Sequence, residues 1–380
     1  MEKRQLTLCL DVLRCPNSCR HCYQETGGGH YKLSLADIRR IVERLKGEAE
    51  SAGVDLTVWP DGKEPMAHPE YFEIMAYLDD MFHMGKARGV VTNGWSIARD
   101  PNFLVRLREY NQKLERIQLT LTDLEDAHDR FVGRRGAFRD LEIAAKRILA
   151  EGLKITWVYV AHGDNIDRLP AMSVWTHSRG FVAGDQSECV FLVKPQGRGR
   201  YLRRLRLGDL EHLPKRFRDM VLAGATWGHM EGLKTEKDIV EAILHDALPT
   251  GCCCEESCYN SKASSLVLEC EYNGDVYPPC HEDHPAFLLG NINRDSLETI
   301  LDRYTRDAIP ALHARRVLGL KELAVRHGRR DCDELHHGCS ICRTLVNRHL
   351  GLEPHGELAW TRDSPAIQGK SDKPAGSGDA

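Results

Sequence analysis

Short apolar runs alternate with longer amphipathic segments over the first 200 residues. Six runs have the alternation or the continuous apolar character of strands, at 6–13, 54–59, 90–94, 116–122, 154–160 and 189–194. Segments with helical spacing separate them, as at Ile38, Ile41, Val42 and Leu45 after the N-cap candidate Ser34. Such alternation indicates crossover connections and a parallel sheet. Because a closed barrel needs about eight strand-helix units, the pattern predicts an α/β fold with a partial (β/α)6 TIM-like barrel.

The pattern changes after residue 200. The next segment is charged and mostly helical, and it predicts a bridge between domains. Beyond it, two short apolar runs flank Tyr272-Asn273-Gly274-Asp275, which is a strong hairpin signal. The end of the chain has few apolar residues and much Gly, Ser and Pro. We therefore predict a barrel at 1–200, a helical bridge at 201–251, a small hairpin-plus-helix domain at 252–350 and a flexible tail at 361–380.

Three cysteines follow the first predicted strand with the spacing C-x3-C-x2-C, at Cys15, Cys19 and Cys22. Three thiolates on one loop can bind three irons of a [4Fe-4S] cube and leave the fourth iron open. The alternative is a zinc site or buried thiols, but zinc sites usually pair C-x2-C units with a fourth thiolate or imidazole. The spacing therefore indicates a cluster whose open position binds a substrate or cofactor.

This motif, followed by Tyr23, resembles the signature of the radical S-adenosylmethionine (SAM) superfamily. The resemblance implies that the amino and carboxylate groups of SAM chelate the fourth iron and that Tyr23 lies beside the adenine. It also implies that reductive cleavage of SAM yields a 5′-deoxyadenosyl radical, which abstracts a hydrogen atom from the substrate. A flavodoxin- or ferredoxin-type protein is then the expected electron donor.

Further segments resemble superfamily motifs in the expected order. Glu64-Pro65 stands where the family has G-G-E-P, which implies that Glu64 holds the SAM ammonium group, although Gly62-Lys63 replaces Gly-Gly. Lys63 must point away from Glu64 or pair with it. The other SAM contacts that the resemblance implies are Thr92 and Asn93 of T-N-G, Thr120 on the ribose side, and Arg130 or Arg134 for the carboxylate. Taken singly, each could also be a turn residue, a strand residue or a surface charge.

A second group of cysteines begins at residue 252. The hairpin ends at Cys280, and a C-x2-C pair at Cys339 and Cys342 follows a helical stretch. These three thiolates and Cys258 could form a closed four-thiolate site, which zinc would also suit. Cys252 could replace Cys258, and Cys270 or Cys332 could serve a second site.

The residues around this group resemble a known type of domain. The run Gly274-Asp275-Val276-Tyr277-Pro278-Pro279-Cys280 and the segment Leu289-Gly290-Asn291-Ile292 are similar to G-D-V-Y-P-C and L-G-N-I of SPASM and Twitch auxiliary-cluster domains. This similarity implies a second, auxiliary [4Fe-4S] cluster bound by Cys258, Cys280, Cys339 and Cys342. A further run, Gly197-Arg198-Gly199, resembles the G-R-G that follows the sixth strand of family members.

Composition narrows the cellular setting. The chain of 380 residues has a formal net charge of −4, which gives no argument for a nucleic-acid or membrane partner. No apolar run is long enough to span a bilayer, and the start leads directly into a strand, so we expect a cytoplasmic protein. Fourteen cysteines in such a chain indicate metal or redox chemistry rather than disulfides.

These observations predict a radical SAM enzyme of the oxidoreductase, lyase or epimerase class. Resemblance to Twitch members favours oxidation, dehydration or epimerisation of a sugar or aminocyclitol in natural-product biosynthesis. One alternative is a ribosomal-peptide maturase of the SPASM type, and a second is a zinc-stabilised binding protein without catalysis. If the reaction is an epimerisation, Cys253 or Cys254 is the candidate thiol that returns a hydrogen atom to the substrate.

Overall fold

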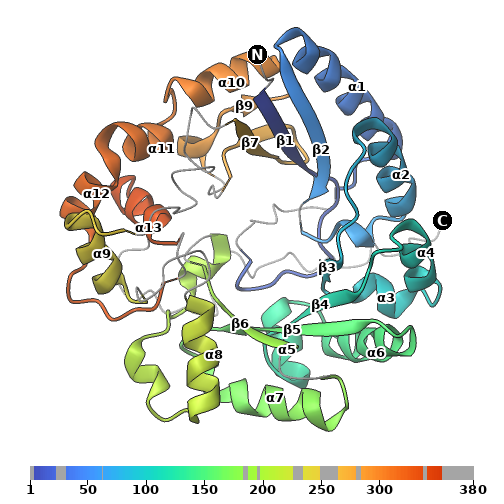
Figure 1. Cartoon of the computed structure of the whole chain (residues 1–380), viewed down its shortest axis with the longest axis vertical. Helices are drawn as coiled ribbons and strands as arrows, with labels where there is room; N and C mark the ends of the chain where they lie inside the picture. Colours follow the sequence, from blue (N-terminus) through green and yellow to red (C-terminus); the bar gives the residue numbers. More distant parts are fainter. Residues whose placement is uncertain are drawn as a thin grey trace, which may run out of the picture.

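The computed structural model describes residues 4–22, 31–61, 63–182, 187–194, 197–225, 234–248, 264–279, 284–336 and 340–352. Its first half alternates strands and helices as predicted (Figure 1). The strands are β1 (Arg4–Asp11), β2 (Val54–Asp61), β3 (Gly89–Thr92), β4 (Arg116–Leu121), β5 (Lys154–Ala161) and β6 (Glu188–Leu192). The helices between them are α1 (Leu35–Ser51), η1 (Pro65–Ala67), α2 (Tyr71–Phe82), α3 (Trp95–Arg99), α4 (Phe103–Tyr110), α5 (Glu125–Val132), α6 (Ala137–Ala150), η2 (Ile166–Arg168) and α7 (Leu169–Ser178).

The strands form two sheets rather than a closed barrel. One is a parallel sheet in the order β3-β4-β5-β6, and the other has the order β2-β1-β7-β8-β9. Strands β7 (Ser265–Cys270), β8 (Asp275–Tyr277) and β9 (Gly290–Asn291) come from the predicted hairpin and the segment after it. The predicted α/β class and the partial barrel are confirmed.

The hairpin continues the sheet of the barrel. Strand β7 pairs in parallel with β1, so that Cys9 lies between Trp59 of β2 and Glu269 of β7. Strand β8 then pairs antiparallel with β7. The carboxyl ends of β2, β1 and β7 therefore meet at one edge, where parallel α/β folds carry their functional side chains.

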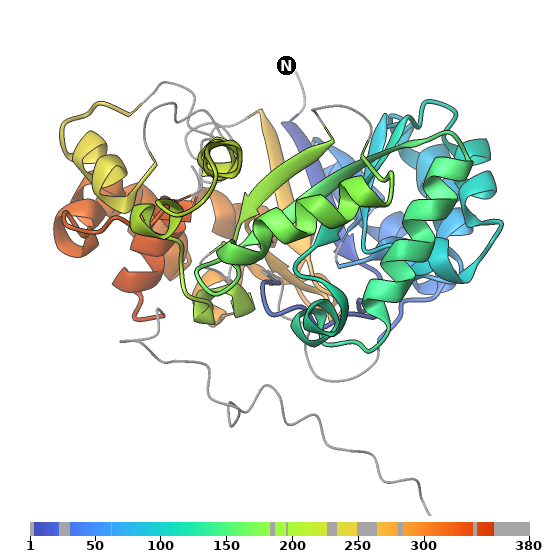
Figure 2. The same cartoon turned by 90° about the horizontal axis from the view of Figure 1, so that it is seen from below.

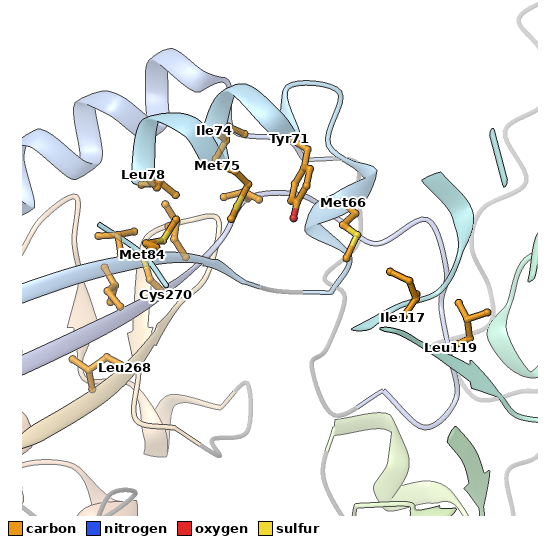
Figure 3. Close-up of a cluster of buried hydrophobic side chains, with 14 of the residues drawn as sticks. Met66, Tyr71, Ile74, Met75, Leu78, Met84, Ile117, Leu119, Leu268 and Cys270 are labelled. Carbon is orange, nitrogen blue, oxygen red and sulfur yellow. The ribbon is translucent and has the colours of Figure 1, made fainter. Parts of the chain in front are cut away.

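The helices follow from local signals in the sequence. Ser34 and Asp37 form a reciprocal capping box at the start of α1, as predicted. The residues at helical spacing on α1 are buried and belong to the main hydrophobic core. Figure 3 shows Ile74, Met75 and Leu78 of α2 in the same core, above the strand that carries Leu268.

The remaining described helices lie beyond β6, with a second, smaller core. They are η3 (Gly197–Tyr201), η4 (Leu207–Leu210), α8 (Lys215–Ala225), α9 (Glu236–Leu244), η6 (Pro285–Phe287), α10 (Leu297–Thr305), α11 (Pro310–His313), the π-helical η7 (Ala314–Leu318), α12 (Gly319–His327) and α13 (Ser340–His349). Helices α9, α12 and α13 share buried residues such as Val240, Leu323 and Leu345. Figure 2 shows them at the opposite end of the molecule from α1 and α2.

The segments after residue 200 contact the barrel directly, since α8 packs on β6 and α10 packs on α1. The four-part division of the chain stays a prediction, and its tail at 361–380 lies outside the described residues. Among the described helices, none combines the length and the apolar character needed to cross a membrane.

Candidate functional site

The cysteine loop follows β1 and is held by the end of α5. The backbone N–H groups of Ser18 and Arg20 donate to the carbonyls of Val132 and Phe131 at 2.8 and 3.0 Å. Gly133 has a φ of +68°, and a Cβ there would lie 3.0 Å from the Ser18 side chain. The positive φ and this close approach explain why glycine ends α5.

A second anchor of the cysteine loop comes from the Gly-Arg-Gly run. The Arg198 N–H donates to the carbonyl of Cys22 at 2.9 Å. A Cβ on Gly199 would lie 2.4 Å from the Lys194 carbonyl and 3.3 Å from that of His21. The Lys194 carbonyl therefore leaves no room for a side chain at position 199, and the cysteine loop passes close to the same position.

The three cysteines are partly buried beside polar groups of the loop and its neighbours. The Asn17 N–H and the Asn93 amide both donate toward Cys15 Sγ, at 3.4 and 3.5 Å. Burial, and secondarily Glu64, raise the pKa of Cys15 to about 12, and burial also raises the pKa of Cys19 with contributions from Cys22 and Cys15. Neighbouring, partly buried thiols that disfavour one another's ionisation suit a bound metal, because its positive charge stabilises thiolates. The residues present thus fit a three-thiolate cluster site.

Glu64 is the buried carboxylate beside this loop. Thr92 Oγ1 donates to Glu64 Oε1 at 2.5 Å, and the Asn93 N–H donates to Glu64 Oε2 at 2.7 Å. Burial raises the pKa of Glu64 to about 7, although both hydrogen bonds act in the opposite direction. A cationic ligand such as an ammonium group would stabilise its ionised form. The structure therefore brings together Glu64, Thr92 and Asn93, which were predicted from separate motifs.

Lys63 takes the first of the two options open to it and points away from Glu64. Its ammonium lies 2.9 Å from Asp11 Oδ2 and 3.2 Å from Glu271 Oε2. No cation from Lys63 therefore competes for the Glu64 carboxylate.

The two candidate arginines differ in position. Arg134 donates from Nε to Asn17 Oδ1 at 2.6 Å and from Nη1 to Asp140 Oδ2 at 2.5 Å. Its Nη2 is buried without a hydrogen-bond partner in the described part of the chain. Arg130 is exposed at the end of α5.

Thr120 is half-buried on β4, between Leu119 and Leu121, which face the core on the other side of the sheet.

Several predicted residues lie outside the described ranges, namely Tyr23, Cys253, Cys254, Cys258, Cys280 and Cys339. Cys342 is buried in α13, and Cys270 is buried at the end of β7. Cys332 is partly exposed. The roles assigned to these residues stay predictions.

Sequence reasoning missed a ring stack beside the cysteine loop. The ring of Phe131 stacks on those of His21 and His162, with centroid distances of 5.5 and 5.1 Å. Burial lowers the pKa of His162 to about 4, which keeps that ring neutral at pH 7. The available signal was the position of His162 directly after β5, on the same edge as the other site residues.

A comparison with protein families identifies the domain that carries this site. The Radical SAM superfamily model matches residues 12–173. The chain therefore contains a radical SAM domain, as the cysteine motif predicted. Domains of this kind bind a [4Fe-4S] cluster and SAM. The family match therefore confirms the cluster and SAM as the predicted cofactors of this domain.

The chain is similar to curated and structurally characterised proteins. It is 30% identical over 162 residues to the PqqA peptide cyclase of Gluconobacter oxydans (strain 621H), covering 42% of either chain. The PqqA peptide cyclase of Methylobacterium sp. (strain 4-46) is 31% identical over 163 residues, covering 42% of this chain and 40% of that protein. The chain thus matches less than half the length of these relatives.

The structure of native anSMEcpe with bound AdoMet has the same fold. Its TM-score is 0.52 at 15% identity, over 91% of this chain and 97% of that one. The same protein has been solved with AdoMet and the Cp18Cys peptide, with a TM-score of 0.50.

These findings correct one prediction. The first choice of a sugar or aminocyclitol substrate is wrong, because the curated relatives are peptide cyclases. The resemblance to Twitch-type enzymes misled because the fold and the cluster motifs do not encode the substrate.

Proposed function

We propose that this protein is a radical SAM enzyme that modifies a peptide, in agreement with the peptide-maturase alternative drawn from the sequence. The identity to PqqA peptide cyclases over the radical SAM domain carries this proposal. The fold shared with anSMEcpe, a protein solved with bound peptide, is consistent with it. The reaction that follows hydrogen abstraction, and the electron donor, stay predictions.

The residues have distinct roles in this proposal. Cys15, Cys19 and Cys22 hold the cluster, while Glu64 accepts hydrogen bonds from the SAM ammonium group. Thr92 and Asn93 act on SAM through Glu64, since both donate to its carboxylate. When bound, the cluster and SAM supply the 5′-deoxyadenosyl radical, and the protein orients SAM and excludes water.

Arg134 is our candidate for the SAM carboxylate. Its unpartnered Nη2 and its bond to Asn17 of the cysteine loop favour it over the exposed Arg130. Thr120 and Tyr23 keep their proposed places at the ribose and the adenine. Cys258, Cys280, Cys339 and Cys342 remain the proposed ligands of the auxiliary cluster.

The proposal is tested with anaerobically reconstituted protein, SAM, dithionite and a panel of candidate precursor peptides. Mass spectrometry should detect a shift in one peptide, such as loss of two hydrogens, that depends on SAM. The matched control is the Cys15→Ala variant, which should form no product. The proposal of a peptide substrate would be contradicted if the protein cleaved SAM and converted a sugar or aminocyclitol but modified no peptide.

Metal analysis separates the non-catalytic alternative. Two clusters predict about eight irons and eight sulfides per chain. Zinc without iron in anaerobically purified protein would support a zinc-stabilised binding protein instead.

A further inference from the structure

A buried group of polar side chains joins the SAM-binding segment to the hairpin. The Lys63 ammonium donates to Asp11 Oδ2 at 2.9 Å, to Tyr31 OH at 2.9 Å and to Glu271 Oε2 at 3.2 Å. The Tyr31 hydroxyl also donates to Asp11 Oδ2. We call Lys63, Asp11, Tyr31 and Glu271 the Lys63 network.

The network is shielded from water. The side chains of Lys63, Asp11 and Glu271 are 2%, 5% and 15% exposed. Burial opposes charge on Lys63, but Asp11 and Glu271 outweigh it and raise the pKa of Lys63, so the ammonium stays protonated. A buried ion of this kind persists only where its partners are held in place. The network therefore fixes the position of Lys63.

The network lies where three strands end. Asp11 is the last residue of β1, Lys63 follows β2, and Glu271 follows β7, and these strands are neighbours in the order β2-β1-β7. The ring of Tyr31 stacks on that of Tyr272 in the hairpin turn, with centroids 3.6 Å apart. One side chain from the segment before Glu64 is thus tied to both the barrel and the hairpin.

We propose that Lys63 is a positioning residue for SAM, and that through it Glu271 of the hairpin supports Glu64 of the SAM site. This inference rests on the proposed contact between Glu64 and the SAM ammonium group. Lys63 and Glu64 are consecutive, so anchoring one restricts where the other can place its carboxylate. Thr92 and Asn93 hold that carboxylate by hydrogen bonds to its two oxygens. In the family motif this position is glycine, which has no side chain that could form such an anchor.

The test is SAM binding by the cluster-loaded protein, measured by anaerobic calorimetry for Lys63→Met, Glu271→Gln and the double variant. We expect Lys63→Met to weaken SAM affinity about tenfold, as loss of an outer-shell partner typically does. Glu271→Gln should have a smaller effect, because the Lys63–Asp11 pair remains. The double variant should bind no more weakly than Lys63→Met, because both substitutions break one network.

A second readout separates positioning from general stability. The change in the EPR spectrum of the reduced cluster on adding SAM should be altered in Lys63→Met at full iron content. Lys321→Met is the matched control, because it removes an exposed lysine that pairs with Asp246 at 2.6 Å; it should bind SAM as the wild type does.

The outcomes are distinct. Wild-type SAM affinity and an unaltered EPR response in fully loaded Lys63→Met would overturn the inference. If Lys63→Met does not load its cluster, Glu271→Gln decides, and wild-type SAM affinity in that variant overturns the inference. Glu64→Gln distinguishes failure of this inference from failure of the proposed contact between Glu64 and SAM. Unchanged SAM affinity in that variant would show that the contact is not made.

Discussion

Arg134 and Arg130 lie four residues apart, yet only Arg134 reaches the cysteine loop. Arg134 bonds Asn17 between Cys15 and Cys19, whereas Arg130 is exposed. We expect Arg134→Gln to weaken SAM binding about ten- to hundredfold, because a hydrogen bond to a charged group contributes about 1.5–3 kcal/mol. Arg130→Gln is the matched control and should bind SAM normally. Equal losses in both variants, measured by anaerobic calorimetry, would count against this assignment.

Glu64 carries a prediction with a similar physical basis. Glu64→Gln keeps the shape of the side chain and removes the charge that would pair with the SAM ammonium group. SAM affinity should fall about ten- to hundredfold while iron content stays unchanged. Titration of SAM into the loaded variant measures this, and an unchanged dissociation constant would show that the Glu64 carboxylate does not contact SAM.

At the residue scale, the sequence could single out Cys15, Cys19, Cys22 and Glu64 as candidate site residues, because motif order and spacing are local properties. It could not choose between Arg130 and Arg134, since both lie near the end of one helix and only packing against Asn17 and Asp140 separates them. The sequence also could not predict the partners of Lys63, because Glu271 is more than 200 positions away in the chain.

At the element scale, the turn after β6 is constrained by the close approach of Gly199 to the Lys194 carbonyl. Gly199→Ala would place a methyl group 2.4 Å from the Lys194 carbonyl. Relief of this overlap must move the backbone that bonds Cys22, at a cost of about 1–3 kcal/mol. We expect a lower melting temperature and poorer cluster loading, measured by thermal denaturation and iron analysis. Gly208→Ala has no atom within 4 Å of its new methyl group and should leave both unchanged.

The helices at the far end of the molecule are joined by a buried ion pair. Arg348 of α13 donates through both terminal nitrogens to Glu236 of α9, and the Glu236 side chain is fully buried. His336 lies 3.5 Å from the same carboxylate. Glu236→Gln leaves Arg348 without its charge partner, so we expect a loss of about 3–5 kcal/mol in unfolding free energy near pH 7. Denaturant unfolding measures this loss.

The same pair sets a pH dependence of stability. Although burial alone would raise it, the hydrogen bonds from Arg348 and His336 hold the pKa of Glu236 below its ordinary value. The unfolded chain therefore takes up the proton first as the pH falls. The contribution of Glu236 should be complete above about pH 4.3 and should decline below it. The stability difference between wild type and Glu236→Gln should narrow in that range, and a constant difference would argue against the ion pair.

Secondary structure could be predicted where periodicity is strong, whereas nonlocal strand pairing could not be predicted. The capping box at Ser34 and the core positions of α1 follow from a few adjacent residues. The hairpin turn was equally visible in Tyr272–Asp275. That β7 pairs with β1, however, joins segments 260 residues apart. No local pattern encodes that contact, so the sequence could not place the hairpin beside β1.

At the scale of the whole molecule, the two proposed clusters should be separable. The ligands proposed for the first cluster, Cys15, Cys19 and Cys22, lie on one loop between β1 and α1. Those proposed for the auxiliary cluster come from residue 258 onward. Replacing Cys15, Cys19 and Cys22 by Ala should abolish formation of 5′-deoxyadenosine and leave about four irons per chain. Cleavage of SAM by this triple variant with dithionite would contradict the assignment of the cysteine loop.

The reciprocal variant tests whether the second cluster serves structure or catalysis. Cys342 is buried in α13, whose residues Ile341 and Leu345 belong to the small C-terminal core, so a cluster there would tie that core to the hairpin. Four protein thiolates leave no open position on a cluster, so this one should not bind SAM. Replacing Cys339 and Cys342 by Ala should lower solubility and peptide modification, while folded protein still cleaves SAM in the absence of peptide. Full peptide modification by a variant with about four irons would show that the second cluster is dispensable for turnover.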